Sequence, residues 1–230
     1  MSKKQLIKTL KSTTESIKSI KPIESLSISS DSPTKIINRG TGAGGANTNK
    51  TGLKFEEKTC IENYLANKKY NKICMKETNK NCYYYKYEDI EKKQQIIYFT
   101  KSGFKMYFRE YFDISTYKEP DEAFLIIKDG KYHLKILEKK NQNVSGSVEE
   151  KLKTGDFIRQ EYELMINDSD KKNKFQVSFA FCVSKYLQDK LTSNTPKYIN
   201  MNKIMKKQNI EIFFGDNSDY HDKLYNWIIL

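Results

Sequence analysis

The sequence predicts an α/β protein with a mixed central β-sheet flanked by helices. Two segments with apolar residues at helical spacing bracket a series of short strands joined by tight turns. The later segment FQVSFAFCV (175–183) is almost continuously apolar, which is typical of a strand buried on both faces. The 230 residues are enough for one domain with a substantial core.

The first helical segment is LKFEEKTCIENYLANKKY (53–70). Its apolar residues recur at helical spacing: Leu53, Cys60, Ile61, Tyr64 and Leu65. Glu56 falls on or beside this apolar face, where carboxylates are uncommon. Two interpretations stay open for Glu56, a border residue that reaches solvent or a functional acid.

Two hairpins are predicted next. The first joins QQIIYF (94–99) to FKMYFREYF (104–112) through TKSG, whose glycine permits a positive φ. The second joins AFLIIK (123–128) to KYHLKILEKK (131–140) through an Asp-Gly pair, which is among the strongest short hairpin signals. These strands should form an antiparallel meander.

The remaining segments extend this order to the C-terminus. VEEKLKTGDFIRQEYELMI (148–166) is predicted to be helical, with Gly155 as a weak point, and the apolar strand follows it. Shorter elements come last: helices near 185–191 and 201–207, a strand at 211–214 and a helix at 220–229. We therefore expect an N-terminal arm (1–38), a core (39–185) and accessory elements of the same domain (186–230).

The charge balance favours a polyanionic partner. The formal net charge is +12 and charged residues make up 30% of the chain. Such a balance is typical of nucleic-acid binding, although a lysine-rich chain from an AT-rich genome would show it too. No run of 18 apolar residues is present and the start lacks a secretory signal, so no membrane partner is expected.

The cysteines do not indicate a metal site. Zinc sites need tighter ligand spacing than these residues show, and only two histidines are available. We expect reduced thiols in a cytosolic protein. The four cysteines of the chain are Cys60, Cys74, Cys82 and Cys182.

Two carboxylates and an ammonium group should meet at one end of the second hairpin. Asp121 precedes the first strand and Glu138 ends the second, so the turn between them brings the two opposite each other. Alternation puts Glu138 and Lys140 on one face and Lys139 on the other. The carboxylates could hold Mg²⁺, which lowers the pKa of a bound water, while Lys140 could position that water or neutralise charge. Glu56 would complete the acidic cluster.

The stretch RGTGAGGANTNKT (39–51) matches a dinucleotide fingerprint and comes within one residue of a P-loop. A dinucleotide loop needs its helix to begin within the glycine motif, but seven small or polar residues precede Leu53. Asn49 stands where the P-loop needs glycine, and no parallel βαβ order follows. We expect no nucleotide cofactor. A loop whose glycines allow close approach to DNA is favoured over one ordered only by its own turns.

The motif P-D precedes one strand, and the motif E-x-K lies on the next strand. A helix bearing Glu56 comes before them and a basic helix comes after them. This arrangement resembles the PD-(D/E)XK nuclease superfamily. The match covers roughly 53–183. The phrases GTGAGGANTNKTGLKFEEKT and KILEKKNQNVSGSVEEKLKTGDFIRQEYE further resemble type II restriction endonucleases of viral or bacterial type. This resemblance implies a restriction-endonuclease-like αβββαβ core and Mg²⁺-dependent cleavage of double-stranded DNA at a short specific sequence. Mn²⁺ should substitute for Mg²⁺. A homodimer in the cytoplasm of a bacterial or virus-infected cell is also implied.

Residue roles follow from the same resemblance. Asp121, Glu138 and Lys140 are implied to be catalytic, with Glu56 as a supporting acid and Gln142 orienting water. The implied metal ligands are Asp121, Glu138 and Glu56. The implied DNA contacts are Arg39, Asn47, Thr48, Asn49, Lys50, Asn141, Asn143, Ser145, Lys151, Lys153 and Arg159. Unlike the group's pattern, the chain has only three arginines, which leaves its base-reading residues open.

Alternatives stay open at this point. The chain could be a repair nuclease that reads junctions, or a DNA-binding module without turnover. The basic helix after the catalytic strand could be an ordinary solvated helix, because its lysines alternate with glutamates. The tyrosines at 83–87 could stack on bases, but core and edge packing is favoured. His133, on the face opposite Glu138, is interpreted as structural, and Glu122 should point away from the cluster.

Overall fold

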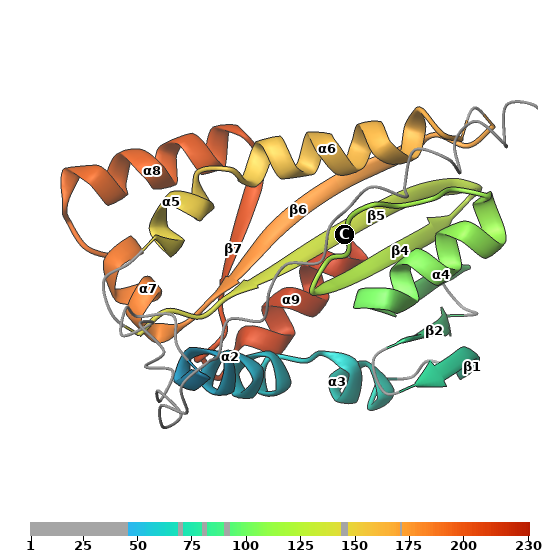
Figure 1. The fold of residues 1–230 in the computed structure, drawn as a ribbon, viewed down its shortest axis with the longest axis horizontal. Coiled ribbons are helices and arrows are strands. Elements are labelled where there is room, and N and C mark those ends of the chain that lie inside the picture. Colours follow the sequence, from blue (N-terminus) through green and yellow to red (C-terminus); the bar gives the residue numbers. More distant parts are fainter. Residues whose placement is uncertain (1–45, 69–70, 80–81, 90–92, 144–146, 171) are drawn as a thin grey trace, which may run out of the picture. The chain divides into compact units, whose positions relative to one another are not determined.

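A mixed β-sheet of seven strands, in sequential order, runs through the part of the chain that the structure describes (Figure 1). The structure is a computed structural model. It describes residues 46–230 apart from 69–70, 80–81, 90–92, 144–146 and 171, and side chains are not described at 46–50, 71–79, 82 and 89. The described residues belong to one compact unit, Gly40–Leu230.

The first strands follow one another directly, whereas helices separate most of the later strands. The helices are α2 (Ala46–Lys58), α3 (Glu62–Ala66), α4 (Lys101–Phe112), α5 (Val148–Leu152), α6 (Gly155–Asn167), α7 (Lys185–Leu191), α8 (Pro196–Lys207) and α9 (Tyr220–Ile229). The strands are β1 (Asn71–Asn79), β2 (Cys82–Asp89), β3 (Gln94–Thr100), β4 (Glu122–Lys128), β5 (Lys131–Lys140), β6 (Phe175–Val183) and β7 (Ile210–Phe214).

The sheet changes direction type at β5. Strands β1 to β5 pair antiparallel, whereas β5, β6 and β7 pair parallel. Parallel neighbours need crossovers, which α5 and α6 supply between β5 and β6, and α7 and α8 between β6 and β7. The prediction of an α/β protein with a mixed sheet flanked by helices is confirmed.

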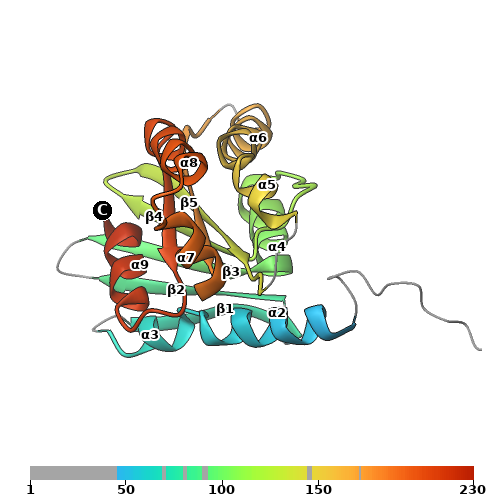
Figure 2. The same cartoon turned by 90° about the vertical axis from the view of Figure 1, so that its left-hand side faces the viewer.

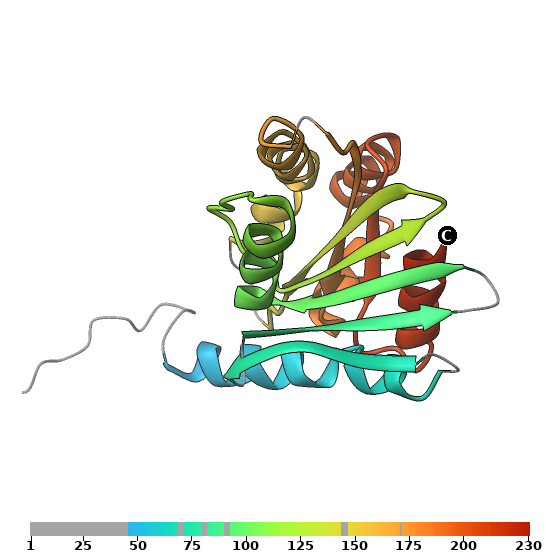
Figure 3. The ribbon, with the colours of Figure 1, turned by 90° about the vertical axis from the view of Figure 1, so that its right-hand side faces the viewer.

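Helices cover both faces of the sheet (Figures 2 and 3). Each face has its own hydrophobic core. One core packs the odd-numbered residues of β4 and β6 and the even-numbered residues of β5 against helices α4 to α8. We call this the α6 face. The other core packs the alternate residues against α2, α3 and α9, and we call it the α2 face. Period-two alternation therefore assigns neighbouring residues of β5 to different cores.

The second predicted hairpin is confirmed by its turn. Asp129 and Gly130 have φ values of 50° and 71°, the positive pair that a two-residue type I′ turn requires. The pairing that follows runs from Lys128 with Lys131 to Glu122 with Leu137. The turn thus fixes which residues meet at the far end, where the candidate site lies. The predicted strand at 175–183 is also confirmed, as β6.

The first predicted hairpin is wrong. Thr100 of TKSG ends β3 and Lys101 begins helix α4, so the segment 104–112 is helical rather than extended. Its buried residues Phe104, Tyr107 and Phe108 are spaced for one helix face, and Asp113 ends the helix in the left-handed conformation. The aromatic residues suggested a strand, but the helical period of the buried positions decides the structure.

The glycine-rich stretch also differs from its prediction. Residues 46–51, expected in a loop before Leu53, form the start of α2. The spacing argument against a dinucleotide loop therefore fails, since the helix begins directly after Gly45. The order of elements still opposes that assignment, because the strands described after α2 pair antiparallel instead of forming a parallel βαβ unit.

Both long predicted helices are divided. The first ends at Lys58, where the Thr59 hydroxyl donates to the Phe55 carbonyl at 2.6 Å, and α3 resumes at Glu62. The second divides into α5 and α6 at Gly155, where a Cβ would lie 2.9 Å from the Phe181 ring. Close packing against β6 thus explains this glycine. Strands β1 and β2 were not predicted, because β1 is mostly polar and β2 combines tyrosines with charged residues and has no aliphatic side chain.

Candidate active site

The predicted catalytic residues lie at the end of the β4–β5 pair. The last pairing of β4 with β5 joins Glu122 to Leu137, so Asp121 comes one position before β4 and Glu138 one position beyond that pair. Glu138 and Lys140 follow Leu134 and Ile136 on the α6 face. The Lys140 ammonium donates to Glu138 Oε2 at 2.7 Å. The side chains of Glu138 and Lys140 are 15% and 20% exposed, so solvent reaches both.

Burial and charge raise the pKa of Glu138. Burial is the main cause, and the nearby carboxylate of Asp121 adds to it, while Lys140 and Lys118 act in the opposite direction. Because two carboxylates held close together favour protonation of one, this end of the sheet attracts positive charge. Such a perturbed acid beside a lysine is a common property of functional sites.

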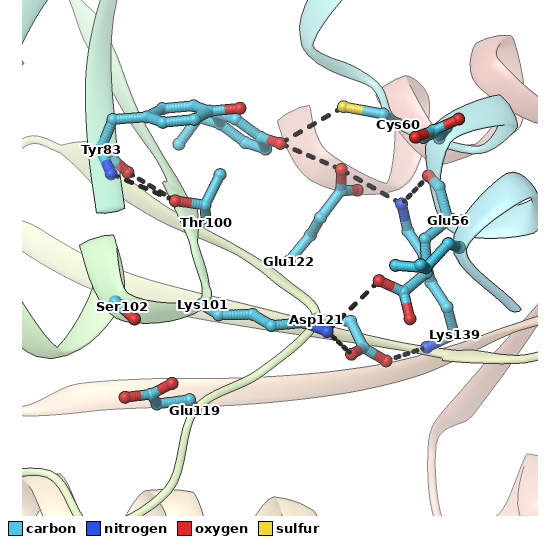
Figure 4. A pocket seen from close by; sticks show the side chains of 13 residues that line it. Glu56, Cys60, Tyr83, Thr100, Lys101, Ser102, Glu119, Asp121, Glu122 and Lys139 are labelled. Atoms are coloured by element: carbon cyan, nitrogen blue, oxygen red, sulfur yellow. Dashed lines mark hydrogen bonds and ion pairs between the residues drawn. The ribbon is translucent and has the colours of Figure 1, made fainter. Parts of the chain in front are cut away.

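Asp121 links the two faces of the sheet. Its Oδ2 atom accepts the backbone N–H of Lys139 at 2.7 Å, which fixes the carboxylate against β5. Its Oδ1 atom lies 3.4 Å from the ammonium of Lys101, the first residue of α4. The same ammonium lies 3.2 Å from Glu56 Oε2 (Figure 4). Glu56 is therefore joined to Asp121 through a lysine rather than by a shared acidic cluster.

A second acid–lysine pair lies on the α2 face. Lys139 Nζ is 3.2 Å from Glu122 Oε1, and these side chains are 3% and 4% exposed. The Tyr98 hydroxyl donates to the same oxygen at 3.0 Å, and Lys139 also donates to the Glu56 carbonyl at 3.0 Å. Glu122 does point away from Glu138, as alternation predicted. Its surroundings make it part of a buried network that ties α2 to the sheet.

Cys60 contacts this network through Tyr98 Oη, 3.5 Å from its sulfur. Burial, followed by the charge of Glu122, raises the pKa of the Cys60 thiol to about 11. A thiol of this kind is a poor nucleophile at neutral pH. Cys60 and Cys182 form no disulfide among the described residues, and the side chains of Cys74 and Cys82 lie outside the described part.

Gln142 is buried next to the end of β6. Its backbone N–H donates to Ser184 Oγ at 3.1 Å, and the Ser184 hydroxyl donates back to the Gln142 carbonyl at 2.8 Å. This double contact fixes the chain directly after Lys140. The water-orienting role of Gln142 stays a prediction.

The structure describes only some of the residues that were predicted to contact DNA. Arg39 and Ser145 lie outside the described residues, and Asn47, Thr48, Asn49 and Lys50 lie in α2 without described side chains. Asn141 is partly exposed, and Asn143 and Lys151 are exposed. Lys153 pairs with Glu150 at 2.6 Å, and Arg159 pairs with Asp156 at 2.9 Å and Glu163 at 2.7 Å. These ion pairs favour an ordinary solvated surface at Lys153, just after α5, and at Arg159 of α6.

Three residues near the site were not predicted. Lys101 lies within TKSG, which was predicted to be a hairpin turn. A correct prediction of the start of α4 would have indicated that Lys101 lies near the site. Lys118 lies near Glu138 and pairs with Glu161 of α6. Tyr162 is fully buried, and burial followed by the charges of Glu138 and Asp121 raises the pKa of its hydroxyl. Its position could be found only from the packing of α6 on the sheet.

Two other predictions concern side chains away from the site. His133 lies on the α2 face, where its Nε2 is 2.7 Å from Ser178 Oγ. Tyr84 and Tyr87 are fully buried, which fits core packing better than stacking on bases. None of the described helices has the length and apolar character needed to cross a membrane.

Among the described residues, no three histidine, cysteine, aspartate or glutamate side chains are grouped as metal ligands. The site instead contains two pairs of carboxylates that could bind a metal ion, Asp121 with Glu138 and Asp121 with Glu56. Comparisons with protein-family models, with curated proteins and with solved structures found no match.

Proposed function

We propose that the protein is a Mg²⁺-dependent endonuclease that hydrolyses phosphodiester bonds of double-stranded DNA. The observation that carries this proposal is the constellation at the β4–β5 end, with Asp121, Glu138 and Lys140 together beside solvent. The sequence pattern P-D, then E-x-K, runs through these residues. A short specific recognition sequence and a homodimer belong to the same proposal, and both rest on the resemblance to type II restriction endonucleases.

The order of elements supports this proposal. With β1, β2, α4 and α5 treated as insertions, the elements α2 and α3, β3, β4, β5, α6 and β6 follow the helix, three strands, helix, strand order that the resemblance implies. The three strands pair antiparallel and the last is parallel to β5. The topology is therefore compatible with a restriction-endonuclease-like core, with β1, β2, β7 and α9 added around it.

The donor chemistry fits Mg²⁺. This ion prefers oxygen ligands and usually takes one or two carboxylates while keeping several waters, so two acids suffice. Asp121 and Glu138 would hold it, with Glu56 available on the other side of Asp121. When bound, Mg²⁺ would supply charge stabilisation at the phosphate and a more acidic water.

The protein's own groups have distinct tasks in this proposal. Glu138 must be ionised, so its raised pKa predicts that activity falls with acidification earlier than an ordinary glutamate would cause. Lys140, released from Glu138, carries a positive charge that can lie against the negative phosphate or orient the attacking water. The Lys139 N–H holds Asp121 in place.

A digestion of long mixed-sequence DNAs in Mg²⁺ tests the proposal. We compare the wild type with Glu138→Ala and Lys140→Ala, and use Lys131→Ala as the matched control, since Lys131 is exposed at the opposite end of the same strand. We expect discrete fragments from the wild type and the control. Both site variants should lose activity by at least about 100-fold, the usual scale for a lost electrostatic or proton-transfer group.

The other outcomes separate the alternatives. A smear that disappears in both site variants would keep the catalytic cluster but assign it to a nuclease directed by DNA structure or without sequence preference. DNA binding without cleavage in Mg²⁺ or Mn²⁺ at any salt concentration would contradict the proposal and leave a binding module.

A further inference from the structure

The segment 113–121, which joins α4 to β4, alternates between buried and exposed residues. At the end of α4, the Ile114 N–H donates to the Phe108 carbonyl at 3.1 Å. Ile114 and Thr116 are 0% and 1% exposed, and Pro120 is also buried before β4 begins. The core therefore anchors the backbone of this segment on both sides of its middle.

Tyr117 lies in the middle of this anchored segment and reaches into solvent. It is 70% exposed, more than any other tyrosine in the described part of the chain. No hydrogen bond or ring contact joins it to another described residue. Packing of the fold therefore does not account for this ring. Because the backbone on both sides is fixed, a ligand that covers the ring orders few additional torsions, and such rigid tyrosines are typical contact residues.

Lys118, the next residue, places this segment beside the candidate active site. Its ammonium pairs with Glu161 of α6 and lies 5.6 Å from the centre of the Tyr162 ring. Burial raises the pKa of Glu138, and the Lys118 charge acts in the opposite direction, so the two side chains are close. The side chains of Lys118 and Glu161 are 29% and 25% exposed. Solvent reaches this ion pair, so the ammonium can exchange its carboxylate for another anion.

An exposed ring next to an ammonium group matches the two parts of a nucleotide. Nucleobases of every kind stack on aromatic side chains, and lysine binds the phosphates of the strand. Tyr117 supplies the ring in solvent, and Lys118 supplies the ammonium near Glu138. A base can stack on the ring only if its face is free. The nucleotide that fits must therefore lie outside the stack of a duplex.

We propose that Tyr117 and Lys118 form a nucleotide subsite beside the candidate active site, where the Tyr117 ring stacks on an unpaired nucleobase and the Lys118 ammonium leaves Glu161 to bind the neighbouring phosphate. The inference rests on the proposed function, because it places this nucleotide next to the phosphodiester bond that the candidate active site would hydrolyse. It adds a substrate class: DNA in which one base near the cleaved bond is flipped out, overhanging or otherwise unpaired.

DNA binding by the full chain in EDTA, where a metal-dependent enzyme does not cleave, tests this inference. Fluorescence anisotropy compares a labelled duplex with the same duplex carrying a single unpaired adenine. The wild type should prefer the unpaired adenine by about tenfold, the scale of one stacked base. Tyr117→Ala should lose this preference, whereas Tyr117→Phe keeps the ring and should retain it. Ile204→Ala, at an exposed apolar residue of α8, is the control and should also retain it.

The role of Lys118 is tested by the salt dependence of the same binding. Loss of one phosphate contact should lower the slope of log affinity against log salt concentration by about 0.7–0.9 in Lys118→Met. Lys105→Met should leave the slope unchanged. Lys105 is an exposed lysine of α4 whose ammonium makes no ion pair among the described residues.

A wild type without preference for the unpaired adenine, or a Tyr117→Ala variant with native circular dichroism that keeps the preference, would overturn the inference. An unchanged salt slope in Lys118→Met would do the same. If Tyr117→Ala does not fold, Tyr117→Leu replaces it with the same expectation. Loss of self-association in light scattering, with the DNA preference retained, would assign the ring to a protein contact instead. Since cleavage is not measured, a protein that prefers the unpaired adenine but cuts no DNA in Mg²⁺ would contradict only the proposed nuclease activity.

Discussion

Two acid–lysine pairs lie at the same end of the β4–β5 hairpin, and they differ in almost every property except composition. Glu138 and Lys140 lie on the α6 face, are 15% and 20% exposed, and have a water-accessible contact of 2.7 Å. Glu122 and Lys139 lie on the α2 face, are 4% and 3% exposed, and are tied to Tyr98 and to the backbone of α2. One pair can therefore meet a ligand, while the other holds the structure together.

The difference shows that position on the strand, rather than residue type, separates chemistry from architecture. Lys139 and Lys140 are neighbours in the sequence, but alternation directs them to opposite cores. A buried charge must be paired and hydrogen bonded, whereas a partly exposed one can exchange partners with solvent. We therefore expect substitutions in the two pairs to have opposite effects on stability and on activity.

The largest expected effect comes from Lys139→Met. This change leaves the Glu122 carboxylate buried without its cation, which should lower the free energy of unfolding by about 3–5 kcal/mol. Lys140→Met should cost less than about 1 kcal/mol, because its partner stays in contact with water. Urea denaturation followed by circular dichroism measures both. Equal losses in the two variants would break the comparison.

An intermediate effect should appear in the pH dependence of stability at His133, also on the α2 face. Burial, with a smaller effect of Lys135, lowers the pKa of His133 from 6.5 to about 4. The unfolded chain therefore binds a proton between these values that the folded chain does not. Stability from this group is complete above pH 6.5 and is lost as the pH falls toward 4.

Thermal unfolding of the wild type and His133→Gln at pH 7.5 and pH 5 measures this effect. The wild type should lose about 1–2 kcal/mol more than the variant on acidification, given the size of the shift. The other histidine, His221, is present in both proteins and does not affect the difference. If both proteins lose the same stability, His133 does not resist protonation in the folded state.

The smallest effect is expected from Glu138→Gln on the α6 face. Unlike the preceding changes, this substitution should increase the free energy of unfolding. Because burial and Asp121 raise the pKa of Glu138, its charge opposes folding at every pH above its folded pKa. Removing that charge should stabilise the protein by about 0.5–1 kcal/mol at pH 7, the gain typical of neutralised functional residues. Urea denaturation at pH 7 measures it. A loss above 1 kcal/mol would assign Glu138 a structural role similar to that of Glu122.

Local patterns were sufficient for part of the fold. The Asp129–Gly130 turn fixed the register of β4 and β5, and the continuous apolar run predicted β6 at its full length. The same register brought Asp121 close to Glu138 and separated Lys139 from Lys140. These features depend on turn geometry and on the period of a strand, both of which are properties of nearby residues.

Other elements of the fold could not be predicted from neighbouring residues in the sequence. The aromatic segment 104–112 has residues that favour strands, but packing of Phe104, Tyr107 and Phe108 on the sheet makes it a helix. The tyrosine-rich strand β2 forms because β3 offers it a paired edge, with Tyr84 and Tyr87 facing opposite cores. Tertiary context overrides propensity in both cases.

The sequence by itself determined the mixed α/β composition, the turn between β4 and β5 and the faces of Asp121, Glu138 and Lys140, because alternation along a strand is set by local geometry. Only the tertiary structure decided that Lys101 lies between Glu56 and Asp121 and that Lys139 is buried with Glu122. These contacts join residues 17 to 45 positions apart on different elements. Their formation depends on how α2 and α4 pack against the sheet, and no local pattern encodes that packing.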